Sequence, residues 1–186
     1  MPDAKPLTIA LIVGSLRKES LNKRLAGALE KLAPDHIRFD HVDISDLPLY
    51  NQDDDKNQAA PVKRIKKQIE EADALLFVTP EYNRSVPGVL KNAIDHASRP
   101  FGKSSWGGKR GAVIGISPGA TGTAMSQQHL RNILAAVDVY LFCLPEAFLQ
   151  MRDGLFTDDG EIGEGSHAFL KGWMDKFVGW VESSGQ

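Results

Sequence analysis

Cysteine is almost missing from this chain of 186 residues, because Cys143 is the only one. A single cysteine excludes an intramolecular disulfide and a thiolate metal cluster. Cys143 lies in the apolar run Val139 to Leu144. Free cysteine behaves as a small apolar residue, so we expect it to be buried. We expect no metal site, because the five histidines lack ligand spacing and the sequence after Asp53 lacks the Gly and Glu of an EF-hand loop.

Long apolar runs and an excess of charge are also missing. No segment reaches the roughly 18 apolar residues of a membrane span. The formal net charge is −2, whereas domains that bind nucleic acid usually carry a strongly basic face. The apolar run Leu7 to Val13 is followed by Gly14 and polar residues, without the cleavage pattern of a signal peptide. We therefore expect a cytoplasmic protein that binds neither membranes nor nucleic acid.

The chain does contain a regular alternation of strand-like and helix-like segments. Five apolar runs predict strands, at 7–13, 37–42, 74–79, 111–117 and 139–144. Segments with apolar residues at helical spacing follow them, at about 21–32, 62–72, 87–97, 125–137 and 167–181, and a long polar loop is expected at 45–60. This order predicts one α/β domain, residues 1–186, with a five-stranded parallel sheet of order 2-1-3-4-5 and helices on both faces. Ligands of such sheets bind beyond the carboxyl ends of strands 1 and 3, where the strand order reverses.

The loop after the first strand carries groups that suit a phosphate. It reads Gly14-Ser15-Leu16-Arg17-Lys18-Glu19-Ser20-Leu21-Asn22, which is neither a dinucleotide fingerprint nor a P-loop. Side chains of Ser15, Ser20 and Asn22 are donors, and Arg17 adds a charged fork. Backbone N–H groups at the start of the next helix point the same way. Two interpretations stay open: the loop binds a terminal monophosphate, or Ser20 only caps the helix and Arg17 is solvated.

Two further loops leave the same edge of the predicted sheet. After the third strand, Pro80 takes the chain out of the sheet, and Tyr82 and Asn83 follow. This loop either holds a flat heteroaromatic ring, with the tyrosine covering one face, or is a rigid turn whose Tyr82 packs on the core. After the fourth strand, the small residues Ser117 to Thr123 let the backbone approach the polar edge of a ring, or form only a flexible connection. Together the three loops describe a site for a mononucleotide with a large planar base.

Two of these segments resemble the motifs of a known family. Residues 14–22 resemble the G-S-x-R-x-x-S-x-N phosphate loop of the NADPH-dependent FMN reductases. Residues 80–95, which read PEYNRSVPGVLKNAID, resemble the second signature of that family. The family includes enzymes described as chromate reductases and quinone reductases, and the likeness runs from about Leu7 to Val181. One departure is His96, where the family often has tryptophan.

The resemblance implies a flavodoxin-like fold, bound FMN, NADPH or NADH as the co-substrate, and a homodimer or homotetramer. Carried over to this chain, the residues that would hold the FMN phosphate are Ser15, Arg17, Ser20 and Asn22, with Leu21 between the last two. The residues that would line the isoalloxazine ring are Pro80, Glu81, Tyr82 and Asn83, with Ser117 and Gly119 on its pyrimidine side. Phe101 and Trp106 either mark a subunit interface or cover the edge of the domain itself.

The expected function is that of an FMN-dependent NAD(P)H oxidoreductase. Hydride would pass from NAD(P)H via FMN to a small-molecule acceptor such as a quinone, chromate or a flavin. No side chain is expected to act as acid, base or nucleophile, because the chemistry resides in the flavin. The alternatives are a flavodoxin-like electron carrier and a redox-sensing flavin-binding module. Carriers tend to be strongly acidic, and the net charge of −2 disfavours that alternative.

Overall fold

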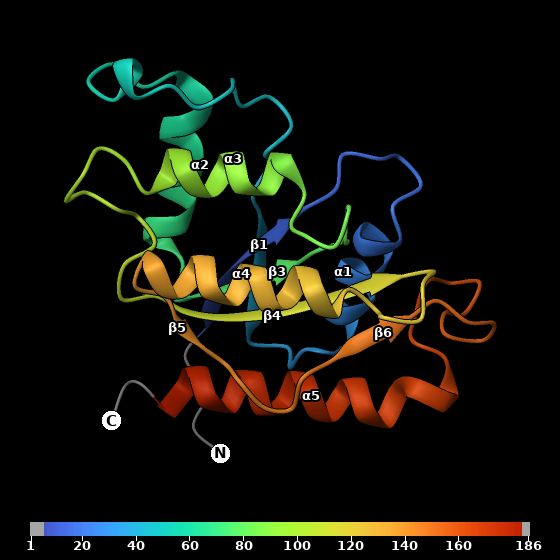
Figure 1. Cartoon of the computed structure of the whole chain (residues 1–186). Coiled ribbons are helices and arrows are strands. Elements are labelled where there is room, and N and C mark those ends of the chain that lie inside the picture. The colour runs from blue at the N-terminus through green and yellow to red at the C-terminus, as the bar shows by residue number, and fades with distance from the viewer. Residues whose placement is uncertain (1–5, 184–186) are drawn as a thin grey trace.

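The computed structural model describes residues 6–183, which alternate between strands and helices (Figure 1). In chain order the elements are β1 (Leu7–Val13), α1 (Leu21–Leu32), β2 (Ile37–His41), η1 (Gln52–Asp54), α2 (Ala60–Glu71), β3 (Ala74–Val78), α3 (Gly88–Ala97), β4 (Arg110–Ser117), α4 (Ala124–Ala136), β5 (Tyr140–Leu141), β6 (Phe148–Gln150) and α5 (Glu164–Glu182). No helix within this described part is long and apolar enough to cross a bilayer.

The strands form one parallel sheet of order β2-β1-β3-β4-β5, which confirms the predicted fold class and strand order. Every residue of β3 is buried, as expected for a strand that helices cover on both faces. Because all these strands are parallel, their carboxyl ends meet at one edge of the sheet. The loops after β1, β3 and β4 therefore leave the sheet on the same side.

The last predicted strand is different in the structure. The expected single strand at 139–144 is only β5, which pairs with the start of β4. The chain then leaves the sheet and returns as β6, which pairs in parallel with the end of β4, from Gly115 to Ser117. Pro145 lies between the two short strands, and a residue without an N–H group cannot donate to a strand ladder. The prediction missed β6 because three residues carry too little pattern to be recognised.

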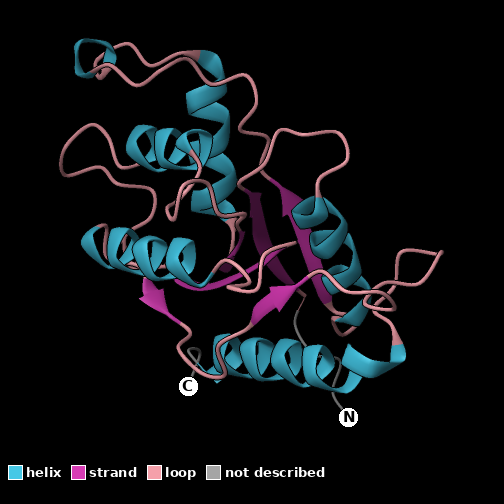
Figure 2. Cartoon of the chain, turned by 45° about the vertical axis from the view of Figure 1, so that its right-hand side comes forward, coloured by secondary structure: helices cyan, strands magenta, loops and turns pink. Residues whose placement is uncertain are grey.

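Helices cover both faces of the sheet (Figure 2). Helices α1 and α5 pack on one face and α2, α3 and α4 on the other, each side with its own apolar cluster. Helix α5 buries Leu170, Trp173 and Phe177 at helical spacing. It begins at Glu164, three residues earlier than predicted.

Two side chains lie elsewhere than the sequence suggested. Cys143 is exposed, because it follows the end of β5 rather than lying inside a strand, so the prediction of burial was wrong. Trp106 is 1% exposed and donates its Nε1–H to the carbonyl of Ile94 at 3.0 Å. It therefore covers the edge of its own domain. Phe101 is 91% exposed and remains available to a partner.

Candidate functional site

The loops after β1, β3 and β4 meet around one small pocket of about 90 Å³. Nine of the eleven predicted site residues line it: Ser15, Arg17, Ser20, Leu21, Asn22, Pro80, Glu81, Tyr82 and Ser117. Ile116 and Pro118 complete the lining, and only Asn83 and Gly119 lie outside it. The fold thus brings together residues that are about 100 positions apart in the sequence.

The chain entering α1 offers several hydrogen-bond donors to this pocket. Ser20 is the N-cap of α1, and its Oγ accepts the N–H of Lys23 at 3.3 Å. This leaves the hydroxyl hydrogen of Ser20 free to donate. Ser15 is buried, whereas Arg17 is exposed at the rim. Hydroxyls, a guanidinium and the first N–H groups of a helix form a donor set that fits a phosphate monoester.

Asn22 has a different environment from the one the motif suggests. Its side chain is 2% exposed, and both ends of its amide bond the backbone of Ile116 in β4. Nδ2–H donates to the Ile116 carbonyl at 2.9 Å, and Oδ1 accepts the Ile116 N–H at 3.0 Å. The side chain therefore fixes the start of α1 against β4. These two bonds use only one of the two Nδ2 hydrogens, so the backbone N–H and the second Nδ2 hydrogen are the groups that Asn22 can offer to a phosphate.

The loop after β3 forms a small hairpin. Tyr82 and Ser85 exchange two backbone hydrogen bonds, at 3.1 and 3.0 Å. The two residues between them, Asn83 and Arg84, have φ of 51° and 61°, as required at both centres of a type I′ turn. Left-handed backbone is unfavourable for a residue such as arginine and is typically found where function requires it. Tyr82 is 46% exposed, so it does not pack in the core and its ring is free to cover a ligand.

The polar side chains at the start of the loops after β3 and β4 are already hydrogen-bonded within the chain. The Glu81 carboxylate turns toward the first turn of α4, where it accepts two backbone N–H groups. Ser117 donates its hydroxyl to the Gly119 carbonyl at 3.1 Å. Pro80 is buried at the end of β3. The backbone, more than the side chains, is thus available to the edge of a ring at these loops.

A larger groove of about 550 Å³ adjoins the pocket and shares Ser15 with it. The groove is lined by the end of β1, by Lys23 and Ala26 of α1, by the last residue of β2, His41, and by residues 42–45, which follow it. Sequence reasoning missed it, because no motif marks the end of an edge strand as a binding surface.

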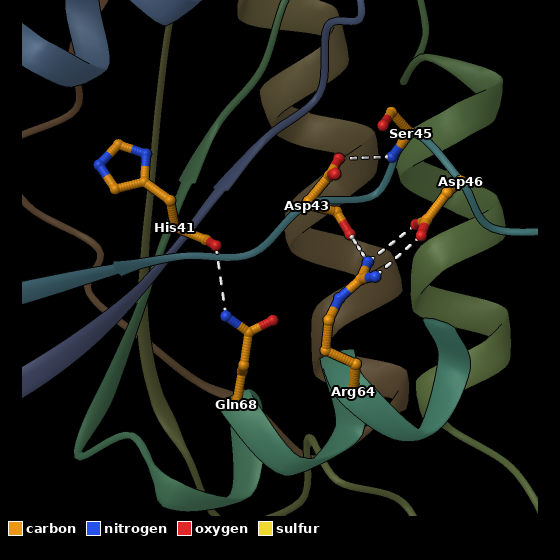
Figure 3. A network of polar contacts seen from close by, with 6 residues as sticks. All are labelled: His41, Asp43, Ser45, Asp46, Arg64 and Gln68. Carbon is orange, nitrogen blue, oxygen red and sulfur yellow. Dashed lines mark hydrogen bonds and ion pairs between the residues drawn. The ribbon is translucent and has the colours of Figure 1, made fainter. Parts of the chain in front are cut away.

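Arg64 of α2 holds one wall of this groove in place (Figure 3). Its guanidinium donates twice to the Asp46 carboxylate, both at 2.8 Å, and once to the Asp43 carbonyl at 2.7 Å. The Asp43 carboxylate accepts the N–H of Ser45 at 2.9 Å. The Ser45 backbone hydrogen bond lowers the pKa of Asp43, and the Arg64 hydrogen bond lowers the pKa of Asp46. Both carboxylates therefore stay charged at neutral pH, and the wall is already formed before any ligand arrives.

Comparisons with known proteins agree with this arrangement. The model of the NADPH-dependent FMN reductase family matches residues 7–150. The chain is 52% identical over 176 residues to a 2-hydroxy-1,4-benzoquinone reductase of a Burkholderia species, covering 94% of this chain and 96% of the relative. It is 47% identical over 177 residues to a quinone reductase of Pseudomonas putida KT2440, covering 94% and 95%.

Solved structures show the same relationship. FerB of Paracoccus denitrificans, described as a flavoenzyme NAD(P)H:(acceptor) oxidoreductase, superposes with a TM-score of 0.92 at 47% identity and covers 95% of this chain and 98% of its own. A flavodoxin, WrbA-like protein from Agrobacterium tumefaciens reaches a TM-score of 0.64 at 15% identity, with 95% and 97% coverage, and supports the flavodoxin-like fold alone. Given the matching family model and these relatives, the chain belongs to the NADPH-dependent FMN reductase family.

Proposed function

We propose that this protein is an FMN-dependent NAD(P)H oxidoreductase whose acceptor is a small quinone, and that residues 1–186 act as one FMN-binding domain. The observation that carries the proposal is the pocket in which the α1 N-terminus, Ser15, Ser20 and Arg17 meet the loops after β3 and β4. The names of the two relatives, which are 52% and 47% identical, support a quinone as the acceptor.

Each loop would have a separate task toward FMN. Ser15, Ser20, Arg17 and the backbone N–H groups of Leu21 and Asn22 would bind the phosphate. The backbone from Pro80 to Asn83 would line the isoalloxazine ring, Tyr82 would cover it, and Ser117 and Gly119 would lie at its pyrimidine side. The bound flavin would supply the hydride chemistry, and the chain would supply position, hydrogen bonds and exclusion of side reactions. Backbone donors at the pyrimidine edge stabilise negative charge there when the ring is reduced.

An absorption spectrum of the purified protein, before and after anaerobic NADPH, tests this function. We expect flavin bands that bleach with NADPH and return on addition of a benzoquinone, with steady NADPH consumption. Chromate and free flavin, offered as alternative acceptors, are expected to be reduced more slowly. Bleaching without steady turnover of any acceptor would instead favour an electron carrier. A protein that takes up no FMN would overturn the proposal.

We also propose that the protein forms a homodimer and works in the cytoplasm. Large apolar side chains are exposed at several places, and the three most exposed are Phe101 (91%) in the loop before β4, Leu49 (87%) in the loop after β2 and Leu144 (74%) after β5. Phe101 lines a groove of about 480 Å³, which would receive a side chain of a second copy.

Sedimentation of the wild type is expected to give twice the mass of one chain. The variants Phe101→Glu and Leu144→Glu are each expected to sediment as monomers, with a circular dichroism spectrum like that of the wild type. A wild type that sediments as a monomer at micromolar concentration would contradict the dimer. Cell fractionation that places the protein in an envelope fraction would contradict the cytoplasmic location.

A further inference from the structure

Helix α4 is capped by a residue from another loop. Its own N-cap, Thr123, has φ of 70° and makes no side-chain capping bond. Instead, Oε2 of Glu81 accepts the N–H of Met125 at 3.0 Å and of Ser126 at 3.2 Å. The first N–H groups of a helix need such an acceptor. Glu81, 44 residues before Met125, therefore takes the place of a local cap.

Two more contacts join the loop after β3 to the same helix. At its start, the hydroxyls of Thr79 and Ser126 lie 3.2 Å apart, both buried. At its end, Ser85 Oγ lies 3.0 Å from Nδ1 of His129. Glu81 lies between these two contacts. The segment 79–85 is thus attached to α4 through Thr79, Glu81 and Ser85, which lie on both sides of the unfavourable turn at 83–84.

The negative charge of Glu81 also changes the electrostatic potential at the N-terminus of α4. The N-terminus of a helix carries a partial positive charge that favours nearby anions. The N-terminus of α4 follows β4 at the sheet edge where the three loops leave, and Glu81, which caps it, is also one of the residues that line the pocket. A carboxylate that accepts two of its N–H groups offsets this positive charge. Reduction of a flavin adds negative charge to its ring system. The electrostatic potential that the α4 N-terminus and Glu81 together produce in the pocket therefore affects how easily the bound flavin is reduced.

We propose that Glu81 is a positioning residue that attaches the flavin-covering loop to α4, and that its carboxylate keeps the bound flavin harder to reduce than the bare helix terminus would. This inference rests on the proposed function, because it requires FMN to bind between the loops after β3 and β4. Glu81 thus acts through α4 and the loop backbone and needs no contact with the substrate.

Two substitutions separate the two effects. In Glu81→Gln the amide oxygen still accepts a hydrogen bond but the charge is lost. We expect the affinity for oxidised FMN to stay within about twofold of the wild type. The affinity for reduced FMN relative to oxidised FMN should rise about two- to fivefold, which is measured as a more positive reduction potential of the bound flavin. In Glu81→Ala the acceptor is lost as well. We then expect FMN to bind about tenfold more weakly.

The attachment itself is tested without FMN, by hydrogen exchange of the Met125 and Ser126 amides in the apo protein. Exchange at these two amides is expected to rise about tenfold in Glu81→Ala and much less in Glu81→Gln. The matched control is Glu164→Gln, which removes a carboxylate from the first turn of α5, on the other face of the sheet. It is expected to change neither the flavin potential nor these two amides.

The possible results separate three claims: the electrostatic role of Glu81, the attachment of the loop to α4, and FMN binding itself. An unchanged flavin potential in Glu81→Gln overturns the electrostatic role. Unchanged exchange at Met125 and Ser126 in Glu81→Ala overturns the attachment. A wild type that binds no FMN overturns the proposed function and with it the electrostatic role, whereas the exchange measurement still decides whether the loop is attached through Glu81.

Discussion

Replacing Asn22 with alanine is expected to lower the free energy of unfolding by about 3 kcal/mol, even without FMN. The last residues of β3 and β4 that pair are Val78 and Ile114. Beyond them, the N–H and carbonyl of Ile116 bond only the Asn22 amide among the contacts described for residues 6–183. Alanine would leave both groups buried without partners, and each such group costs roughly 1–3 kcal/mol. The start of α1 would also lose its fixed position against β4.

Denaturant unfolding of the apo protein measures this effect, and Arg17→Ala is the comparison. Arg17 is exposed and lines the pocket, so its loss should weaken FMN binding about tenfold while apo stability stays within about 0.5 kcal/mol. Asn22→Ala should lower both apo stability and FMN affinity. If Asn22→Ala behaved like Arg17→Ala, with normal apo stability, Asn22 would be a direct phosphate ligand rather than a structural bridge.

Replacing Gly115 with alanine is expected to be still more damaging. A Cβ at this position of β4 would lie well under 3.0 Å from the carbonyl oxygen of Thr79 and from Oγ1 of Thr123. Real Cβ atoms essentially never show such contacts, and one neighbour is backbone that cannot rotate away. The clash would separate β4 from the end of β3, where the loops of the site begin. We expect a loss of more than about 3 kcal/mol, with loss of FMN binding.

Gly27→Ala is the matched control for this substitution. A Cβ at Gly27 in α1 would meet nothing within 4 Å, and alanine in a helix is about 0.5–1 kcal/mol better than glycine. Thermal melting followed by circular dichroism should therefore show a small rise for Gly27→Ala and a large fall, or no folded protein, for Gly115→Ala. A Gly115→Ala protein that melts like the wild type would contradict the close approach of β4 to Thr79.

Most of the fold could be predicted because its signals are local. The apolar runs at 7–13 and 74–79 and the helical spacing at 21–32 predicted β1, β3 and α1 nearly to the residue. Parallel strands with helical crossovers leave few possible strand orders. Because the carboxyl ends of parallel strands meet at one edge, the three loops of the site could be identified without coordinates.

Other features depended on contacts between distant residues. The two short strands at 140–141 and 148–150 exist only where they meet β4, so their lengths follow from tertiary pairing rather than from local propensity. The same holds for Cys143, which is exposed because the chain leaves the sheet just before it.

The sequence by itself determined the α/β class, the strand order, the loops that line the candidate pocket and the family, because periodicity and short motifs are properties of neighbouring residues. Only the tertiary structure decided what the polar side chains of those motifs do. Asn22 bonds Ile116 across 94 positions, and Glu81 bonds Met125 across 44. A buried donor or acceptor takes whichever partner the fold places within about 3 Å, and no local pattern records that partner.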